Sequence, residues 1–176
     1  MKASELFTVA RAEIGVKESP AGSNKVKYNT DYYGREVSGL NLSWCMVFVW
    51  WCFKQAGGSA LFYNGGKTAS CGTLMYWAKS IGKWAVKDYR PGDIAIMDFG
   101  NDGEQDHVGI VESVSSAGLV CIEGNTSLTS NDNGGAVMRR ERPYKYIMGA
   151  YRPDFESEED IVPRYNTMKE IPGWAR

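Results

Sequence analysis

Apolar residues in the first half of the chain recur at helical spacing. The first such segment, SELFTVARAEIG (4–15), begins at a capping serine and ends at a glycine, which predicts a short amphipathic helix. Residues 16–42 are rich in Gly, Asn, Ser and Tyr and predict loops or short turns. A second helix is predicted from a cap at Ser43 through CMVFVWWCFKQA to the stop at Gly57-Gly58, and its all-round apolar character is typical of a buried central helix. A third helix is predicted over 73–81.

After Arg90-Pro91-Gly92 the pattern changes to short β-rich segments separated by turn residues. These segments cover residues 93–99, 107–114, 119–123, 136–142 and 147–151. Helices followed by successive strands with short connections predict an α+β fold, in which N-terminal helices pack on an antiparallel β-sheet. We expect one domain over 1–153, because the acidic stretch DFESEED begins at 154. The rest, 154–176, is predicted to be a tail or a junction toward a module absent from this chain.

Composition and charge restrict the class of protein. Of the 176 residues, 43% are hydrophobic and 23% are charged, as in a soluble folded domain. The 20 Lys and Arg residues balance 21 Asp and Glu residues, so no cationic excess exists to bind a nucleic-acid backbone. The N-terminal segment lacks the continuous apolar core of a signal peptide, and no stretch reaches the roughly 18 apolar residues of a membrane span. We therefore expect a protein made in the cytoplasm without a signal peptide, with free thiols, no membrane span and no nucleic-acid partner.

The only histidine, His107, has the one side chain whose unperturbed pKa lies near neutrality. It begins the segment HVGIVESV directly after the polar loop 100–106, which places it at a sheet edge facing that loop. Alone, such a histidine fits a surface or structural role. Its neighbours make it a candidate general base.

A cysteine supplies the matching nucleophile. The four cysteines form no CxxC pair, which together with the single histidine argues against a structural zinc site. Cys45 would lie in the first turn of the second predicted helix, where free N–H groups and the helix dipole lower the pKa of a thiol. Cys71 could open the third helix and is the rival candidate, whereas Cys52 and Cys121 fit core positions. We favour Cys45 because a buried helix holds its first turn rigidly.

An imidazole that activates a cysteine needs a group that orients it. The segment IEGN places Glu123 and Asn125 two residues apart, and hence on one face of a strand. The turn SSAG predicts a hairpin, and if Val114 pairs with Gly118, His107 faces Asn125 with Glu123 as its diagonal neighbour. In a register shifted by one residue, both polar side chains point to the opposite face and are only the polar end of a strand.

Five segments, taken in order, resemble the sequence blocks of the CHAP family, the cysteine- and histidine-dependent amidohydrolases/peptidases of phage endolysins and bacterial cell-wall hydrolases. They are WCMVFVWWCFKQAG, RPGDIAIMDF, DHVGIVESV, IEGN and IMGAYRP, and the resemblance covers residues 4–153. It implies a papain-like fold related to the NlpC-type enzymes, with the nucleophilic cysteine at the start of the central helix. It also implies Cys45 as nucleophile, His107 as general acid and base, and Glu123 with Asn125 as the orienting pair.

The resemblance implies hydrolysis of an amide bond in bacterial peptidoglycan by cysteine nucleophilic catalysis. The enzyme would be an N-acetylmuramoyl-L-alanine amidase or a stem or cross-bridge endopeptidase of the phage endolysin type, which acts on the cell wall after release. The absent C-terminal module would then be wall-binding. Two alternatives stay open: a papain-like effector protease or transferase that acts on a protein, and a non-catalytic wall-binding module.

Some CHAP domains hold calcium in an acidic loop before the cysteine, with two aspartates spaced by one residue. The corresponding stretch, NTDYYGREVSGLNLSW, contains Asp31 and Glu36 but no Asp-x-Asp. Calcium prefers six or more oxygen ligands, and this loop offers few carboxylates. We therefore expect neither a metal nor another cofactor.

Overall fold

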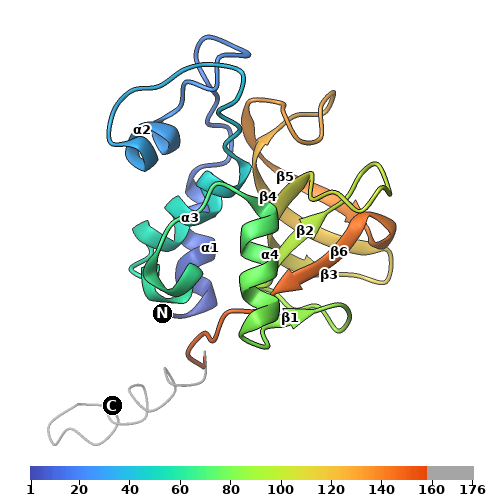
Figure 1. The fold of residues 1–176 in the computed structure, drawn as a ribbon. Helices are drawn as coiled ribbons and strands as arrows, with labels where there is room; N and C mark the ends of the chain where they lie inside the picture. Colours follow the sequence, from blue (N-terminus) through green and yellow to red (C-terminus); the bar gives the residue numbers. More distant parts are fainter. Residues whose placement is uncertain (158–176) are drawn as a thin grey trace, which may run out of the picture.

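Helices on one side and a β-sheet on the other form two layers (Figure 1). The computed structural model describes residues 1–157. The helices are α1 (Ala3–Ala12), α2 (Lys27–Tyr33), α3 (Cys45–Gln55) and α4 (Cys71–Ser80), with the short 3-10 helices η1 (Ser59–Leu61), η2 (Tyr63–Gly65) and η3 (Tyr144–Tyr146). The strands are β1 (Trp84–Ala85), β2 (Ile94–Met97), β3 (His107–Val114), β4 (Gly118–Thr126), β5 (Ala136–Pro143) and β6 (Ile147–Tyr151). Their order in the sheet is β1-β6-β2-β3-β4-β5 and every neighbouring pair is antiparallel, so the predicted α+β fold is confirmed.

Helix α3 packs on β3 and β4 and also contacts α1 and α2. The side chains of residues 46–49, Cys52 and Phe53 are completely buried, which confirms the predicted buried central helix. A large apolar cluster joins α1, α3 and α4 to the sheet. A smaller cluster on the other face of the sheet consists of Ala95, Met97, Val111, Leu119, Cys121 and Ala150.

The segment predicted as loops and turns contains one helix, α2, that its sequence does not indicate. Its residues, KYNTDYY, have modest helix propensities, so tertiary packing has to stabilise it. Tyr28 is fully buried with its ring 5.4 Å from that of Trp44. Asn29 Nδ2 donates to the backbone oxygens of Asn24 and Leu42, which fixes the loops on both sides of the helix.

The hairpin of β3 and β4 changes its register along its length. Near the turn, Val114 pairs with Leu119 and not with Gly118. An extra residue in β3, Glu112, then forms a bulge that shifts the pairing by one residue. Beyond the bulge, the register places the single histidine and the carboxylate of β4 on the same face of the sheet.

The close approach of α3 to β4 depends on Gly124. A Cβ atom at this position would lie 2.6 Å from Phe48 Cβ and 3.0 Å from Trp44 Cζ3, both shorter than van der Waals contact. The helix can therefore pack directly against the strand because residue 124 has no side chain. This packing brings the start of α3, and with it Cys45, to the sheet.

The described chain ends in contact with the domain. Lys83 pairs with Asp154, the ring of Phe155 stacks on that of Phe53 at 6.3 Å, and the N-terminal ammonium pairs with Glu156. Most of the predicted junction, residues 158–176, lies outside the described residues.

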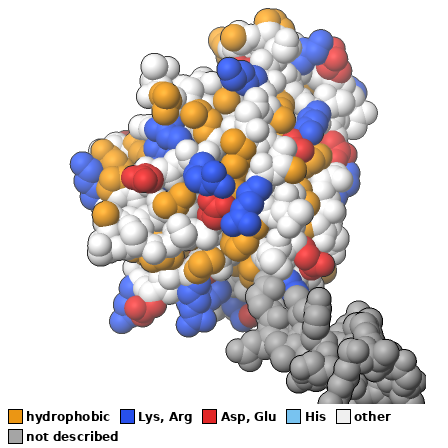
Figure 2. Space-filling view, turned by 180° about the vertical axis from the view of Figure 1, so that it is seen from behind, with side chains coloured by type: hydrophobic (Ala, Val, Ile, Leu, Met, Phe, Trp, Pro, Cys, Tyr) orange, Lys and Arg blue, Asp and Glu red, His pale blue; other side chains and the backbone are white. Residues whose placement is uncertain are grey.

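The surface carries charges of both signs. On the face shown in Figure 2, Lys and Arg side chains alternate with Asp and Glu side chains and do not gather into a patch of one sign. Within residues 1–157, no helix is long and apolar enough to cross a bilayer.

We expect Gly124→Ala to lower the free energy of unfolding by about 1–3 kcal/mol, because the new methyl group overlaps Phe48 Cβ, which cannot move without its backbone. Urea unfolding measures the change. The control is Gly72→Ala, whose Cβ would lie 2.6 Å from Oε1 at the end of the flexible Gln105 side chain and otherwise in ordinary van der Waals contact. Equal stability of the two variants would contradict the role given to Gly124.

Candidate active site

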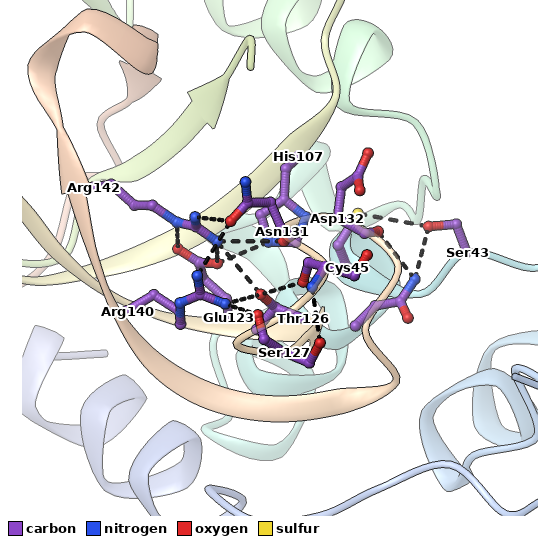
Figure 3. A network of polar contacts seen from close by, with 12 residues as sticks. Ser43, Cys45, His107, Glu123, Thr126, Ser127, Asn131, Asp132, Arg140 and Arg142 are labelled. Carbon is purple, nitrogen blue, oxygen red and sulfur yellow. Dashed lines mark hydrogen bonds and ion pairs between the residues drawn. The ribbon is translucent and has the colours of Figure 1, made fainter. Parts of the chain in front are cut away.

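Cys45 is the first residue of α3 and is buried where that helix meets the sheet (Figure 3). The predicted cap at Ser43 is wrong: Trp44 occupies the N-cap position, and packing of its buried ring decides where the helix begins. Trp44 Nε1 also donates to Glu18 at 3.3 Å. Ser43 Oγ instead lies 4.0 Å from Cys45 Sγ. The free N–H groups of the first turn and the helix dipole favour a thiolate at this position.

His107 and Glu123 form a buried pair on the neighbouring strands β3 and β4. His107 Nε2 lies 2.9 Å from Glu123 Oε2, and neither side chain is exposed to solvent. The imidazole also faces Cys45 (Figure 3). Its Nδ1 has no hydrogen-bond partner among the described residues, so this is the nitrogen free to exchange a proton with the sulfur.

The groups around Cys45 stabilise its thiolate. The pKa of Cys45 lies well below its ordinary value, because a hydrogen bond from the Cys71 thiol and the positive charge of the nearby His107 outweigh the effect of burial. Burial lowers the pKa of His107, but the Glu123 carboxylate and Cys45 raise it to about 9. Between these two pKa values the pair exists as thiolate and imidazolium.

Arg142 contacts the same carboxylate. It is not among the candidate site residues identified from the sequence. Its Nε donates to Glu123 Oε1 at 2.8 Å, and its Nη2 donates to Oε2 at 2.5 Å. Burial raises the pKa of Glu123, but hydrogen bonds from Arg142 and the charge of His107 hold it below its ordinary value. One signal exists in the sequence: Arg140 and Arg142 alternate in AVMRRERP, which places two arginines on one face of a strand.

Asn125 does not contact the imidazole through any hydrogen bond within the described chain. Its Nδ2 donates to Ser43 Oγ at 3.0 Å, and its Oδ1 accepts from the backbone N–H of Gly135 at 3.2 Å. Its φ of 57° turns the strand at this point. Of the two residues expected to orient the histidine, Glu123 makes the contact, whereas Asn125 holds Ser43 and the loop that follows β4.

The remaining cysteines differ in their surroundings. All four lie within the described residues and are free thiols. Cys52 and Cys121 are fully buried, and burial raises the pKa of both. Cys71 is the first residue of α4 and lies beside Cys45, so the rival nucleophile is a neighbour of the favoured one. The contact with Cys45 and burial raise the pKa of Cys71, which leaves it as a thiol donor.

The acidic residues before the cysteine are paired with lysines. Lys54 contacts Asp31 at 2.5 Å, and Lys25 contacts Glu36 at 2.9 Å. Across residues 1–157, no group of three or more His, Cys, Asp or Glu side chains is arranged to hold a metal ion.

Two solved structures are similar to this structure. The structure of a wild type endolysin, LysIME-EF1, matches 89% of this chain with a TM-score of 0.54 and 13% sequence identity. The chain spans 66% of the LysIME-EF1 chain, slightly less than two thirds. The structure of Ly7917 matches 87% of this chain with a TM-score of 0.49 and 13% sequence identity. The match covers 63% of the Ly7917 chain. The similarity to LysIME-EF1 shows a shared fold, and this is the papain-like fold that the sequence blocks imply.

A comparison with curated proteins found no match. Among protein families, the model of the CHAP domain matches residues 37–125, slightly more than half of the chain. The matched segment contains the helix start, the histidine and the carboxylate that form the buried site. The chain therefore belongs to the CHAP domain family.

Proposed function

We propose that this protein hydrolyses an amide bond of bacterial peptidoglycan, with Cys45 as nucleophile, His107 as general acid and base, and Glu123 as the group that orients the imidazole. The observation that carries the proposal is the buried arrangement in which His107 lies between Glu123 and Cys45 at the start of α3. Membership of the CHAP family and the fold shared with an endolysin support peptidoglycan as the substrate class.

The reaction uses the two groups in sequence. The Cys45 thiolate attacks the carbonyl carbon, and the backbone N–H of Cys45 at the helix start donates to the developing oxyanion. The imidazolium of His107 gives its proton to the amine as the C–N bond breaks, leaving a thioester. His107, now neutral, takes a proton from a water molecule that attacks the thioester, and the thiolate is restored. Asn125 supports this site indirectly, because it holds Ser43 beside the sulfur.

The bond cleaved is either the one between muramic acid and L-alanine or one within the stem or cross-bridge peptide. Digestion of purified cell walls, followed by mass spectrometry of the released muropeptides, identifies it through the position of the new amino group. Cleavage of proteins but not of walls would favour an effector protease. Wall binding without release of any amino group would favour a non-catalytic module.

Cys45→Ala is expected to reduce wall hydrolysis at least about 10³-fold, because no other thiol occupies the first turn of α3. Cys71→Ala is expected to keep activity within about tenfold, since it removes a hydrogen bond to the thiolate but not the nucleophile. Turbidity loss of a wall suspension and circular dichroism report activity and folding. Activity lost in the Cys71 variant and retained in the Cys45 variant would reverse the assignment.

Alkylation by iodoacetamide should report the thiolate of Cys45 directly. Because the pKa of Cys45 is lowered, its reaction rate is expected to stay on a plateau through neutral pH and to fall only at acidic pH. His107→Gln removes the imidazolium and should raise the midpoint of this profile. Peptide mass spectrometry provides the internal control, since Cys52 and Cys121 are buried and their pKa values are raised. Identical midpoints in the wild type and His107→Gln would exclude the ion pair.

A further inference from the structure

We infer that Arg142 is a positioning residue: it keeps Glu123 a carboxylate that only accepts hydrogen bonds, so that neutral His107 carries its proton on Nε2 and presents a bare Nδ1 to Cys45. The inference deepens the proposed function and rests on it, because Nδ1 matters only if Cys45 and His107 exchange a proton. Arg142 contributes no contact to the sulfur or the imidazole, and it acts through Glu123 alone.

The contacts of Glu123 show how the carboxylate is held. Three donors reach it: Arg142 Nε at 2.8 Å from Oε1, and Arg142 Nη2 at 2.5 Å and His107 Nε2 at 2.9 Å from Oε2. Arg142 therefore binds both oxygens with its planar fork, which fixes the plane of the carboxylate. Oε2 is directed at His107 as a result (Figure 3).

Charge compensation gives Arg142 a role that His107 cannot fill. Glu123 is completely buried, and a buried carboxylate needs a compensating charge to remain ionised. The imidazole supplies that charge only while it is protonated, and in the catalytic cycle it gives the proton away. Arginine does not lose its proton in proteins, so the guanidinium of Arg142 is the permanent counter-charge, and the side chain that carries it is only 4% exposed.

The tautomer of His107 follows from the charge of Glu123. An ionised carboxylate has no proton to donate, so Nε2 must carry the hydrogen and Nδ1 remains an acceptor for the proton of Cys45. A protonated Glu123 could instead donate to Nε2, which would move the ring hydrogen to Nδ1. An imidazole in that form faces the sulfur with an N–H and cannot act as a base toward it.

The guanidinium is itself fixed from several sides. Asn131 accepts from Nη1 through Oδ1 at 2.8 Å and from Nη2 through its backbone oxygen at 3.3 Å. Thr126 Oγ1 lies 3.4 Å from Nη2, and the ring of Phe99 lies 4.9 Å below the guanidinium carbon. Arg142 thus links the loop after β4 to the carboxylate, and its placement does not depend on His107.

The neighbouring Arg140 offers a matched control. It lies on the same strand and the same face, and it contacts the same loop through Thr126, Ser127 and Asn131. No hydrogen bond between Arg140 and Glu123 occurs in the described structure. Loss of Arg140 therefore removes a similar charge and similar loop contacts without removing a partner of the carboxylate.

The test is the tautomer of His107, read from the ring nitrogen shifts of protein labelled with [15N]histidine. The chain contains a single histidine, so the signals need no assignment. Measurements are made in a Cys45→Ala background, which prevents thiolate formation and exposes the neutral imidazole to titration. We expect the Nε2–H tautomer with Arg142 present, a shift toward the Nδ1–H tautomer in Arg142→Gln, and restoration of the Nε2–H tautomer in Arg142→Lys, which keeps the charge. Arg140→Gln should retain the Nε2–H tautomer.

Turnover gives the second readout, measured with Cys45 in place. Arg142→Gln should lower kcat by roughly 10²- to 10⁴-fold with KM nearly unchanged, as expected when a catalytic histidine is held in the wrong tautomer. An unchanged tautomer in Arg142→Gln, or an Nδ1–H tautomer in the parent protein, overturns the inference. If Arg142→Gln does not fold, an Nδ1–H tautomer in Arg142→Lys overturns it equally. Since the tautomer is observed in a protein without its nucleophile, it does not depend on any wall substrate, and failure of the proposed function remains distinguishable.

Discussion

The buried carboxylate of Glu123 lies between two cations, the imidazolium of His107, which can lose its proton, and the guanidinium of Arg142, which cannot. Glu123 is fully buried, and its ionisation is maintained by His107 on one side and Arg142 on the other. The charge of the imidazole depends on this ion. Against the effect of burial, this carboxylate and Cys45 raise the pKa of the imidazole to about 9, and the Cys71 thiol and the imidazolium together lower the pKa of the Cys45 thiol. The Cys45 thiol is thus influenced by a charge with which it has no direct contact.

These charge interactions require that the helix and the strands that carry the three side chains keep fixed positions. The first two turns of helix α3 are almost completely buried, and the helix lies directly on β4 at Gly124. Strand β4 carries Glu123 and pairs with β3, which carries His107, so the helix start and both strands are held in direct contact. Asn125, next along the strand, adds a polar link to Ser43 beside the sulfur. Packing and hydrogen bonding therefore act on the same few residues where the helix start meets the strand end.

Patterns in the sequence predict the elements that carry this site. Alternation and turn residues give β3 and β6 their observed bounds, and the apolar helix beginning near Cys45 is found where expected. Local signals fail where tertiary contacts decide the outcome. The start of α3 is set by the buried ring of Trp44 and not by a serine cap, and α2 is formed from poor helix formers because Tyr28 is buried. The contact between Arg142 and Glu123 joins strands whose pairing no short sequence window reveals.

The bulge at Glu112 separates the turn of the β3–β4 hairpin from the end that carries His107 and Glu123. Side chains alternate along a strand, so adding or removing one residue within the paired part of β3 or β4 would turn His107 or Glu123 to the opposite face. The bulge absorbs such an odd residue, and hydrogen bonds from Arg11 and Arg139 to the Glu112 carboxylate anchor it to α1 and β5. The hairpin therefore imposes a parity rule on its paired strands: one residue can be added between His107 and the turn only if a further bulge absorbs it, whereas two residues leave the facing of both side chains unchanged.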